Sequence, residues 1–222
     1  MFRERDPFGR ALTTLRDQLR RGAYGQGQPL GIAQLARDFE LSPTPVREAL
    51  SRLAGRGLVE DRRGRGYFTP RLDVLDVTEL YDLSGLHLGQ ALADLDLAAR
   101  RPLEDDGAAR AALQAVRTGP DPREALGAYS EALFDQIVRA AGNRTRAACH
   151  AMTADRLGPV RRVEPLVLAG VPEELADLAD RFAASDWAGL GHSVAAFHAR
   201  RRAAASRIVS ALRDVPVTYR NI

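Results

Sequence analysis

The sequence contains no lysine, one cysteine and no long apolar run. All 32 basic residues are arginine, which we attribute to a GC-rich genome rather than to function. The lone Cys149 excludes an internal disulfide framework and fits a reducing compartment. No stretch approaches the length needed to cross a bilayer, and the N-terminus lacks the apolar segment of a secretory signal. We therefore expect a cytoplasmic protein that does not bind a membrane.

Patterns typical of catalysis are also missing. Cys149 and His150 are neighbours in an expected helix, where adjacent side chains point about 100° apart and cannot form a nucleophile–base pair. Gly64-Arg65-Gly66 is too short for a phosphate-binding loop and precedes no helix. The four histidines are scattered, without ligand partners at helical spacing. We predict no enzyme activity, no catalytic residues and no cofactor.

Positive charge is concentrated near the N-terminus. Residues 1–71 contain 14 Arg and 8 Asp or Glu, a balance of +6, whereas residues 72–222 contain 18 and 21, a balance of −3. A basic N-terminal segment joined to a mildly acidic remainder is typical of a polyanion-binding module followed by a second domain. We call residues 1–71 the basic head. We therefore predict two domains, comprising residues 1–71 and 72–222.

The basic head has the pattern of three short helices. Apolar residues recur at spacings of three and four over about 8–21, and a shorter helix is expected around 32–39. The third helix would begin after Ser42, a suitable N-cap. Its prolines, Pro43 and Pro45, fall in the first turn, where backbone N–H groups have no intrahelical acceptor.

Two short strands are expected after the third helix, over 58–62 and 66–69. The segment Arg63-Gly64-Arg65-Gly66 between them supplies glycines where a hairpin needs positive φ. Three helices followed by a basic hairpin predict a winged helix-turn-helix. This fold has one dominant use, which is reading the major groove of double-stranded DNA.

From about residue 74 onward the pattern is almost entirely helical, and Asp73 with Asp76 suits the start of the first helix. Glycines and prolines separate the expected helices by short turns, which predicts an antiparallel bundle. We therefore expect a mainly α protein with an all-helical second domain. The expected helices are about 74–100, 103–117, 122–141, 143–157, 173–184 and 186–213, with breaks that include Gly158-Pro159.

The run from Thr44 to Leu50, followed by Gly57-Leu58-Val59 and Gly64-Arg65-Gly66-Tyr67, resembles the GntR family of bacterial transcription regulators. The helical domain resembles the FadR/FCD subfamily, its VanR-like branch in particular, and Ala141-Gly142-Asn143 is similar to a helix-ending signature there. The resemblance implies a homodimer on a palindromic operator, with each recognition helix in a major groove. It further implies a small-molecule effector that binds the helical domain and releases DNA, which favours a repressor.

The expected DNA contacts combine hydroxyl and guanidinium groups. Arg47 suits a bidentate pair with a guanine edge or a phosphate clamp, and the arginines of the hairpin suit a narrow groove or the backbone. On an isolated helix Arg47 would be interpreted as a solvated side chain, but the complete order of elements favours DNA binding. The predicted contact residues are Arg37, Ser42, Thr44, Arg47, Arg52, Arg63 and Arg65.

The effector site is less well defined by the sequence. Many FCD domains bind a divalent metal through one Asp and up to three His, and these positions fall here on Ser130, Phe134, Leu175 and either Phe197 or His198. At most one imidazole remains, so we expect no metal. The arginine that commonly anchors a carboxylate effector falls at Ser84.

Three alternatives stay open for the helical domain: a metal-free pocket for a more apolar ligand, a ligand-independent dimerisation scaffold, or part of an architectural DNA-binding dimer. A ligand-binding domain would place a cavity among the bundle helices. The predicted pocket residues are Leu83, His87, Ser130, Phe134 and His198.

Overall fold

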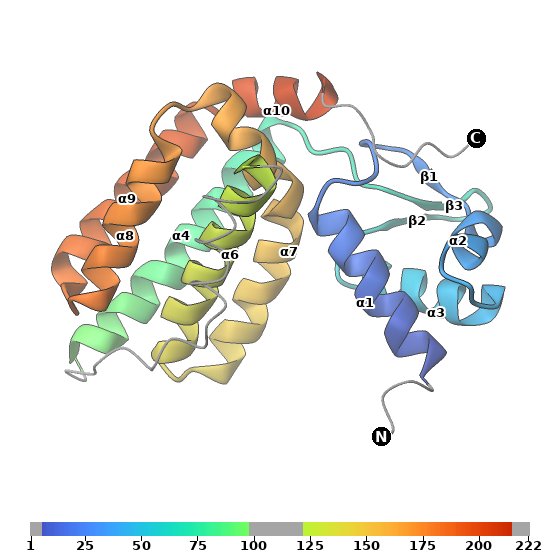
Figure 1. Ribbon diagram of the computed structural model, residues 1–222, viewed down its shortest axis with the longest axis horizontal. Helices are drawn as coiled ribbons and strands as arrows, with labels where there is room; N and C mark the ends of the chain where they lie inside the picture. Colours follow the sequence, from blue (N-terminus) through green and yellow to red (C-terminus); the bar gives the residue numbers. More distant parts are fainter. Residues whose placement is uncertain (1–5, 98–121, 215–222) are drawn as a thin grey trace. The chain divides into compact units, whose positions relative to one another are not determined.

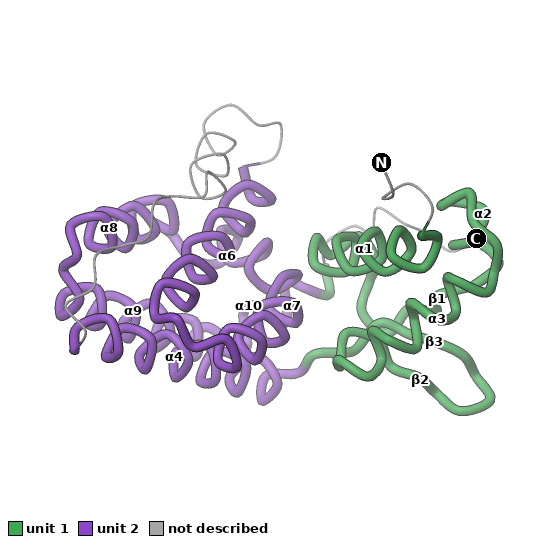
Figure 2. Tube along the Cα trace, turned by 90° about the horizontal axis from the view of Figure 1, so that it is seen from below, with its two compact units in different colours: residues 1–72, 213–222 green, residues 73–212 purple. Residues whose placement is uncertain are grey.

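The computed structural model describes residues 6–97 and 122–214, and its helices and strands are labelled in Figure 1. The chain forms two compact units, an N-terminal unit that ends at Leu72 and a helical unit over Asp73–Leu212 (Figure 2). The predicted mainly α fold is confirmed. None of the described helices is both long and apolar enough to cross a membrane.

The N-terminal unit consists of three helices and a small antiparallel sheet. Its elements are α1 (Pro7–Arg20), β1 (Pro29–Leu30), α2 (Ile32–Asp38), α3 (Pro43–Ala54), β2 (Glu60–Arg62) and β3 (Gly66–Phe68). The strands are ordered β1-β3-β2, so β1 adds a third strand to the predicted two-stranded ribbon. Because β1 has only two residues, it produces no alternating pattern that could predict it.

A single apolar core joins the three helices of this unit to the sheet. Leucines and alanines at helical spacing form the buried faces of α1 and α3. Leu58 and Val59 are buried just before β2, so the chain is anchored in the core where the hairpin begins. The most deeply buried residues of this core are Ala11, Leu15, Leu35, Val46, Ala49, Leu50 and Leu53.

The helical unit is built from long helices in two layers. Its described elements are α4 (Val74–Leu97), α6 (Pro122–Ala140), α7 (Arg144–Val167), α8 (Val171–Ala183), α9 (Trp187–Ala203) and α10 (Ala205–Asp214). Figure 2 shows α9, α4 and α7 in one row, with α8 and α6 on the other side. The start of α4 is closed as expected, because the N–H of Asp73 donates to Asp76 and the N–H of Asp76 donates to Asp73.

Two helix boundaries in this unit were predicted wrongly. Gly158-Pro159 does not end a helix, because α7 continues to Val167 through both Pro159 and Pro165. Leu157 and Val160 are fully buried on either side of Pro159, so packing outweighs the local helix-breaking tendency. The final helix, expected as one segment, is instead divided into α9 and α10 at Ala204. The helix predicted over 103–117 lies outside the described residues.

Candidate functional site

Helix α3 has one buried face and one face exposed to solvent. Pro45, Val46, Ala49, Leu50 and Leu53 are buried against α1 and α2. The exposed face carries Thr44, Arg47, Glu48, Ser51 and Arg52. The buried stripe therefore fixes the helix, and a polar ridge of hydroxyl and guanidinium groups remains available.

The first turn of α3 has unusually few backbone donors. Ser42 occupies the N-cap, as predicted, but its side chain makes no capping hydrogen bond. Pro43 and Pro45 have no N–H, so of the four N–H groups that a helix start leaves without an intrahelical acceptor, only those of Ser42 and Thr44 remain. An anion at this end would be bound by two N–H groups together with the hydroxyls of Ser42 and Thr44.

The turn between α2 and α3 is fixed by backbone contacts. Glu40 has a left-handed φ of 54°, and the N–H of Leu41 donates to the carbonyl of Ala36 at 2.9 Å. On the exposed side of α2, Arg37 donates to Gln34, whose amide in turn donates to Asp38 at 2.7 Å. The guanidinium of Arg37 is thus oriented along α2 rather than extended from it.

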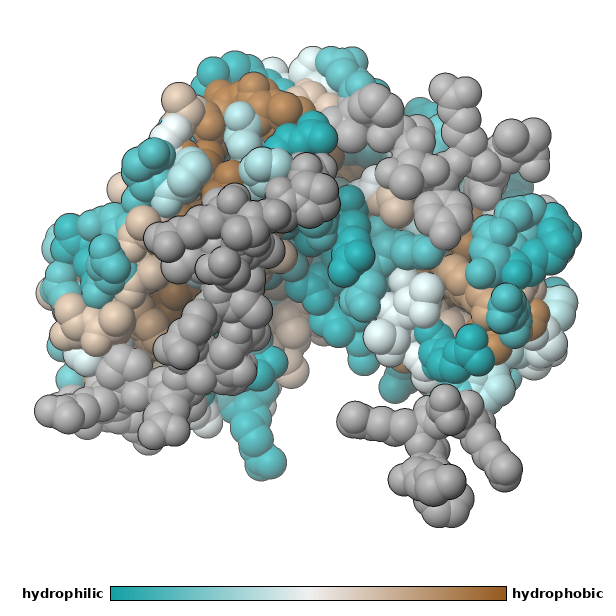
Figure 3. Space-filling view, viewed as in Figure 1, coloured by the Kyte–Doolittle hydropathy of each residue, from teal (hydrophilic) through white to brown (hydrophobic). Residues whose placement is uncertain are grey.

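The hairpin between β2 and β3 presents two arginines at its tip. Gly64 and Gly66 have positive φ of 73° and 89°, and the N–H of Arg65 closes the turn on the carbonyl of Arg62 at 2.7 Å. Arg63 and Arg65 are exposed. Figure 3 shows hydrophilic residues over much of the visible face of this unit.

Arg62 has a different role from its neighbours, which the sequence did not reveal. Its guanidinium donates to Glu60 at 2.7 Å and stacks on the ring of Phe68 at 4.3 Å. Both partners lie on the hairpin, so Arg62 stiffens the ribbon on which the tip is carried.

Four of the predicted contact residues carry charge that the described part of the chain does not neutralise. Within residues 6–97 and 122–214, no hydrogen bond or ion pair involves the guanidinium groups of Arg47, Arg52, Arg63 and Arg65. Arginines held in this way on a helix ridge and a hairpin tip match the electrostatic needs of a phosphate backbone and guanine edges.

Residues 9–69 match the protein family described as "Bacterial regulatory proteins, gntR family". The N-terminal unit is thus similar to the DNA-binding domain of that family. The matched segment begins in α1 and ends just after β3, so it contains the whole winged helix-turn-helix. The match covers the winged helix-turn-helix, and the helical second unit lies outside the matched residues. No curated protein matches the sequence.

Solved structures resemble the whole chain in fold. A transcriptional regulator GntR from Rhodococcus sp. RHA1 aligns with a TM-score of 0.74 at 18% identity, over 89% of this chain and 96% of that one. E. coli McbR/YncC aligns at 0.70 and 21% identity, over 91% and 98%. A GntR family member from Pseudomonas syringae pv. tomato str. DC3000 aligns at 0.50 and 19% identity, over 93% and 89%. At these identities the likeness shows a shared fold.

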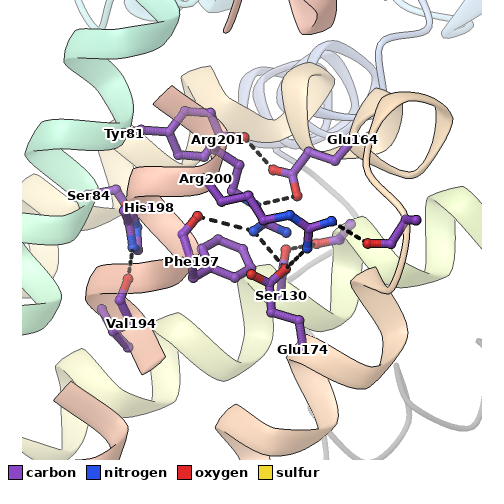
Figure 4. Close-up of polar contacts among 12 residues, drawn as sticks. Tyr81, Ser84, Ser130, Glu164, Glu174, Val194, Phe197, His198, Arg200 and Arg201 are labelled. Carbon is purple, nitrogen blue, oxygen red and sulfur yellow. Dashed lines mark hydrogen bonds and ion pairs between the residues drawn. The ribbon is translucent and has the colours of Figure 1, made fainter. Parts of the chain in front are cut away.

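The helical unit encloses a network of buried charges (Figure 4). Arg201, which has no exposed surface, donates to Glu164 at 2.8 Å and to Glu174 at 2.7 Å. The hydroxyl of Tyr81 donates to the other oxygen of Glu164. The guanidinium of Arg201 also lies over the ring of Phe197, 3.2 Å from its centroid. This network joins α4, α7, α8 and α9.

Burial and charge set the ionisation of this network. Burial, followed by the charge of Glu164, raises the pKa of the Tyr81 hydroxyl well above its ordinary value, so Tyr81 stays protonated and donates. Burial alone would lower the pKa of Arg201, but the charge of Glu164 and other neighbouring groups raises it. Arg201 and Glu164 therefore form a buried ion pair that holds α9 to α7.

His198 sits beside this network as a neutral imidazole. Its Nδ1–H donates to the carbonyl of Val194 at 2.7 Å, and its Nε2 lies 3.1 Å from the hydroxyl of Ser84. Burial lowers the pKa of His198 to about 4, and the charges of Arg161 and Arg201 act in the same direction. Since the ring is neutral and its proton is on Nδ1, Nε2 accepts from Ser84.

Two further imidazoles, those of His87 and His150, lie between α4 and α7. The rings of His87 and His150 are T-shaped, with centroids 6.0 Å apart. His150 is almost fully buried, and its pKa is lowered to about 3 by burial and then by the charge of Arg161. Within the described residues, no hydrogen-bond partner reaches either ring nitrogen of His150 or Nδ1 of His87. These atoms are unusual, because buried polar groups are normally paired.

The predicted pocket residues are brought together only in part. Phe134 and His198 are buried and in contact, with ring centroids 5.8 Å apart. Ser130 is buried and donates to the carbonyl of Gly127 in its own helix. Leu83 does not join them: it faces solvent, and the next residue, Ser84, is the buried one. No three His, Cys, Asp or Glu side chains among the described residues are close enough to hold a metal.

Proposed function

We propose that this protein is a DNA-binding transcriptional regulator that binds a palindromic operator as a homodimer. It represses transcription until a small-molecule effector releases the protein from the operator. The observation that carries the DNA-binding part is the exposed polar ridge of α3, on which Arg47 has no partner among the described residues. A single head of this size contacts one half-site. Two heads related by a two-fold axis would read a palindrome, and the additional contacts would supply operator affinity.

The residues of the head divide into two roles. Arg47 lies near the N-terminal end of α3, where a recognition helix contacts base edges, and its two parallel N–H groups fit the O6 and N7 acceptors of guanine. Ser42, Thr44, Arg37 and Arg52 would hold phosphates and fix the register of the helix in the groove. The arginines of the hairpin tip would contact the flanking minor groove or backbone.

Arg47→Ala tests this assignment. We expect operator affinity to fall about 5- to 150-fold, which corresponds to 1–3 kcal/mol, and base preference to relax at one position of each half-site. The operator would first be selected from genomic fragments, and binding measured by fluorescence anisotropy on every single-base variant. Arg207→Ala is the matched control, because it removes the same charge from an exposed position on α10.

Two results would argue against the proposal. Unchanged affinity and base preference in Arg47→Ala would remove the ridge of α3 from the interface. Equal affinity of the unaltered protein for unrelated duplexes would favour the architectural alternative, since a sequence-specific regulator prefers its site by about 4–10 kcal/mol.

The effector would bind in the interior of the helical unit, as in the FCD domains that this unit resembles. The supporting observation is the set of buried ring nitrogens on His87 and His150 that lack hydrogen-bond partners among the described residues. Neutral imidazoles offer one donor and one acceptor each, and Phe134 offers an apolar wall. These groups suit a small organic molecule that carries both polar and apolar parts and needs no metal.

His150→Leu tests the effector site. Candidate metabolites would be screened for compounds that raise the melting temperature of the unaltered protein and weaken its operator binding. We expect His150→Leu to bind the operator normally but to lose most of the response, because the ligand loses a buried hydrogen-bond partner. A compound that releases operator equally well from His150→Leu would contradict the site.

A further inference from the structure

Helix α4 carries large apolar side chains on its outer surface. Leu75, Leu83, Leu86 and Leu97 are 63%, 42%, 66% and 86% exposed. A leucine that is mostly exposed gains no stability from burial, and single examples are common on any surface. Four on one helix of 24 residues form a surface feature that calls for an explanation.

These leucines lie on one side of the helix. At 100° per residue, the steps from Leu75 to Leu83, Leu86 and Leu97 place all four within an arc of about 80°. Glu79, Gln90 and Ala93 are exposed in the same arc. We call this outer face of α4 the leucine stripe. It is distinct from the buried stripe that holds α4 in the bundle, which includes Leu80, Leu88 and Leu95.

The leucine stripe lies in the middle of one layer of the helical unit. Figure 2 shows α4 between α9 and α7. Ion pairs join α4 to its neighbour on each side: Asp82 to Arg202 of α9 at 2.6 Å, and Asp94 to Arg146 of α7 at 2.7 Å. A largely apolar centre, in which Glu79 is the one charged residue, bordered by charges that are already paired, resembles the composition of a protein–protein interface.

We propose that the leucine stripe is the surface through which two copies of this chain associate, with their α4 helices antiparallel about Leu86. Leu75 and Leu97 are equidistant from this residue (86 − 75 = 97 − 86 = 11), so a two-fold axis at Leu86 places Leu75 of each copy near Leu97 of the other. Glu79 and Ala93 are related in the same way, seven residues on either side. The stripe is thus complementary to itself, as an isologous interface requires.

Charge selects the antiparallel arrangement. Helix α4 contains five acidic residues and no arginine: Asp76, Glu79, Asp82, Asp94 and Asp96. In a parallel pair each carboxylate would face its own copy, and Glu79 would lie against Glu79. In the antiparallel pair Glu79 faces Ala93, and Asp82 is near Gln90, whose amide can donate to it. The one pair of carboxylates that this register places opposite each other, Asp76 and Asp96, lies outside the arc of the leucine stripe.

The inference rests on the proposed homodimer and adds the surface that forms it. Leu86→Arg would place a charged guanidinium group from each copy on the two-fold axis, where the two would repel each other. We expect its dimer dissociation constant to rise about 30-fold or more, measured by sedimentation equilibrium. Ala176→Arg adds the same side chain at an exposed position of α8, in the other layer, and should leave the constant unchanged. Far-ultraviolet circular dichroism would check that both variants fold.

A cross-linking experiment keeps the proposal testable if Leu86→Arg fails to fold. Leu86→Cys would be made together with Cys149→Ser, because Cys149 is an exposed thiol. A residue on a two-fold axis faces its own copy, so a short bis-maleimide should join Leu86→Cys into covalent dimers. Ala176→Cys in the same background should give few.

The outcomes distinguish a wrong assignment of the surface from the absence of a homodimer. If the unaltered protein is dimeric, but Leu86→Arg dimerises equally well and Leu86→Cys does not cross-link, the assignment of the surface is wrong and the homodimer stands. If the unaltered protein is monomeric at all concentrations, both fail, and the leucine stripe serves a different partner.

Discussion

At the scale of single residues, the helical unit solves the problem of burying polar groups in two different ways. Arg201 stays charged because Glu164 and Glu174 accept its hydrogen bonds, and removing either carboxylate would leave positive charge buried without full compensation. His150 and His198 instead stay neutral, because burial and nearby guanidinium groups disfavour a further positive charge. The unit thereby tolerates its arginines but not protonated imidazoles.

This difference predicts that stability falls in mild acid. The pKa values of His150 and His198 are lowered to about 3 and about 4, whereas an unfolded histidine titrates near 6.5. Between these values only the unfolded chain binds the proton, so stability is constant above about pH 7 and decreases as the pH falls through 6.5 toward 4. From pH 7 to pH 5 each histidine contributes a loss of about 2 kcal/mol.

Urea unfolding followed by the fluorescence of Trp187 would measure this loss. Trp187 is the only tryptophan and is buried in the helical unit, so its signal reports on that unit. We expect the decrease between pH 7 and pH 5 to be about 2 kcal/mol smaller in His150→Leu than in the unaltered protein, and undiminished in His192→Leu, which changes an exposed position. Identical pH profiles for the unaltered protein and His150→Leu would disprove the role of the buried imidazole.

At the scale of helices and strands, local signals determined what could be predicted. Helix α3 was found because its N-cap, first-turn prolines and buried stripe all lie within a dozen residues, and the hairpin because its glycines stand at the turn. The course of α7 through Pro159 depends instead on packing against α4 and α6, which no local pattern reports. The same holds for β1, which exists only because β3 lies beside it.

The candidate sites follow the same division. The residues of the DNA-binding head are local in sequence, so their exposure on α3 and on the hairpin tip could be anticipated. The interior network was missed, because Glu164 and Arg201 look like solvated charges until helices distant in sequence enclose them. The error at Leu83 is one of helix phase: α4 has leucines on several sides, so its sequence did not show that Ser84 faces inward.

At the scale of the whole molecule, charge is divided unequally along the chain. The first 71 residues carry +6 and the remaining residues −3, so the attraction to a polyanion is concentrated in the N-terminal unit. Two heads on one operator would double this attraction, and the salt dependence of binding would measure how many phosphates they contact.

The hairpin tip should account for part of that salt dependence. Arg63→Ala combined with Arg65→Ala removes four guanidinium groups from a dimer, and each phosphate contact contributes about 0.9 to the slope of log affinity against log salt concentration. We therefore expect the slope to become shallower by about 2 to 4, measured on the operator between 50 and 200 mM salt. Arg207→Ala combined with Arg213→Ala removes the same charge from exposed positions on α10 and should change the slope little. If the two double variants change the slope equally, only the net charge of the protein matters and the hairpin does not touch DNA. If only the double variant of Arg63 and Arg65 makes the slope shallower, the hairpin is part of the DNA interface.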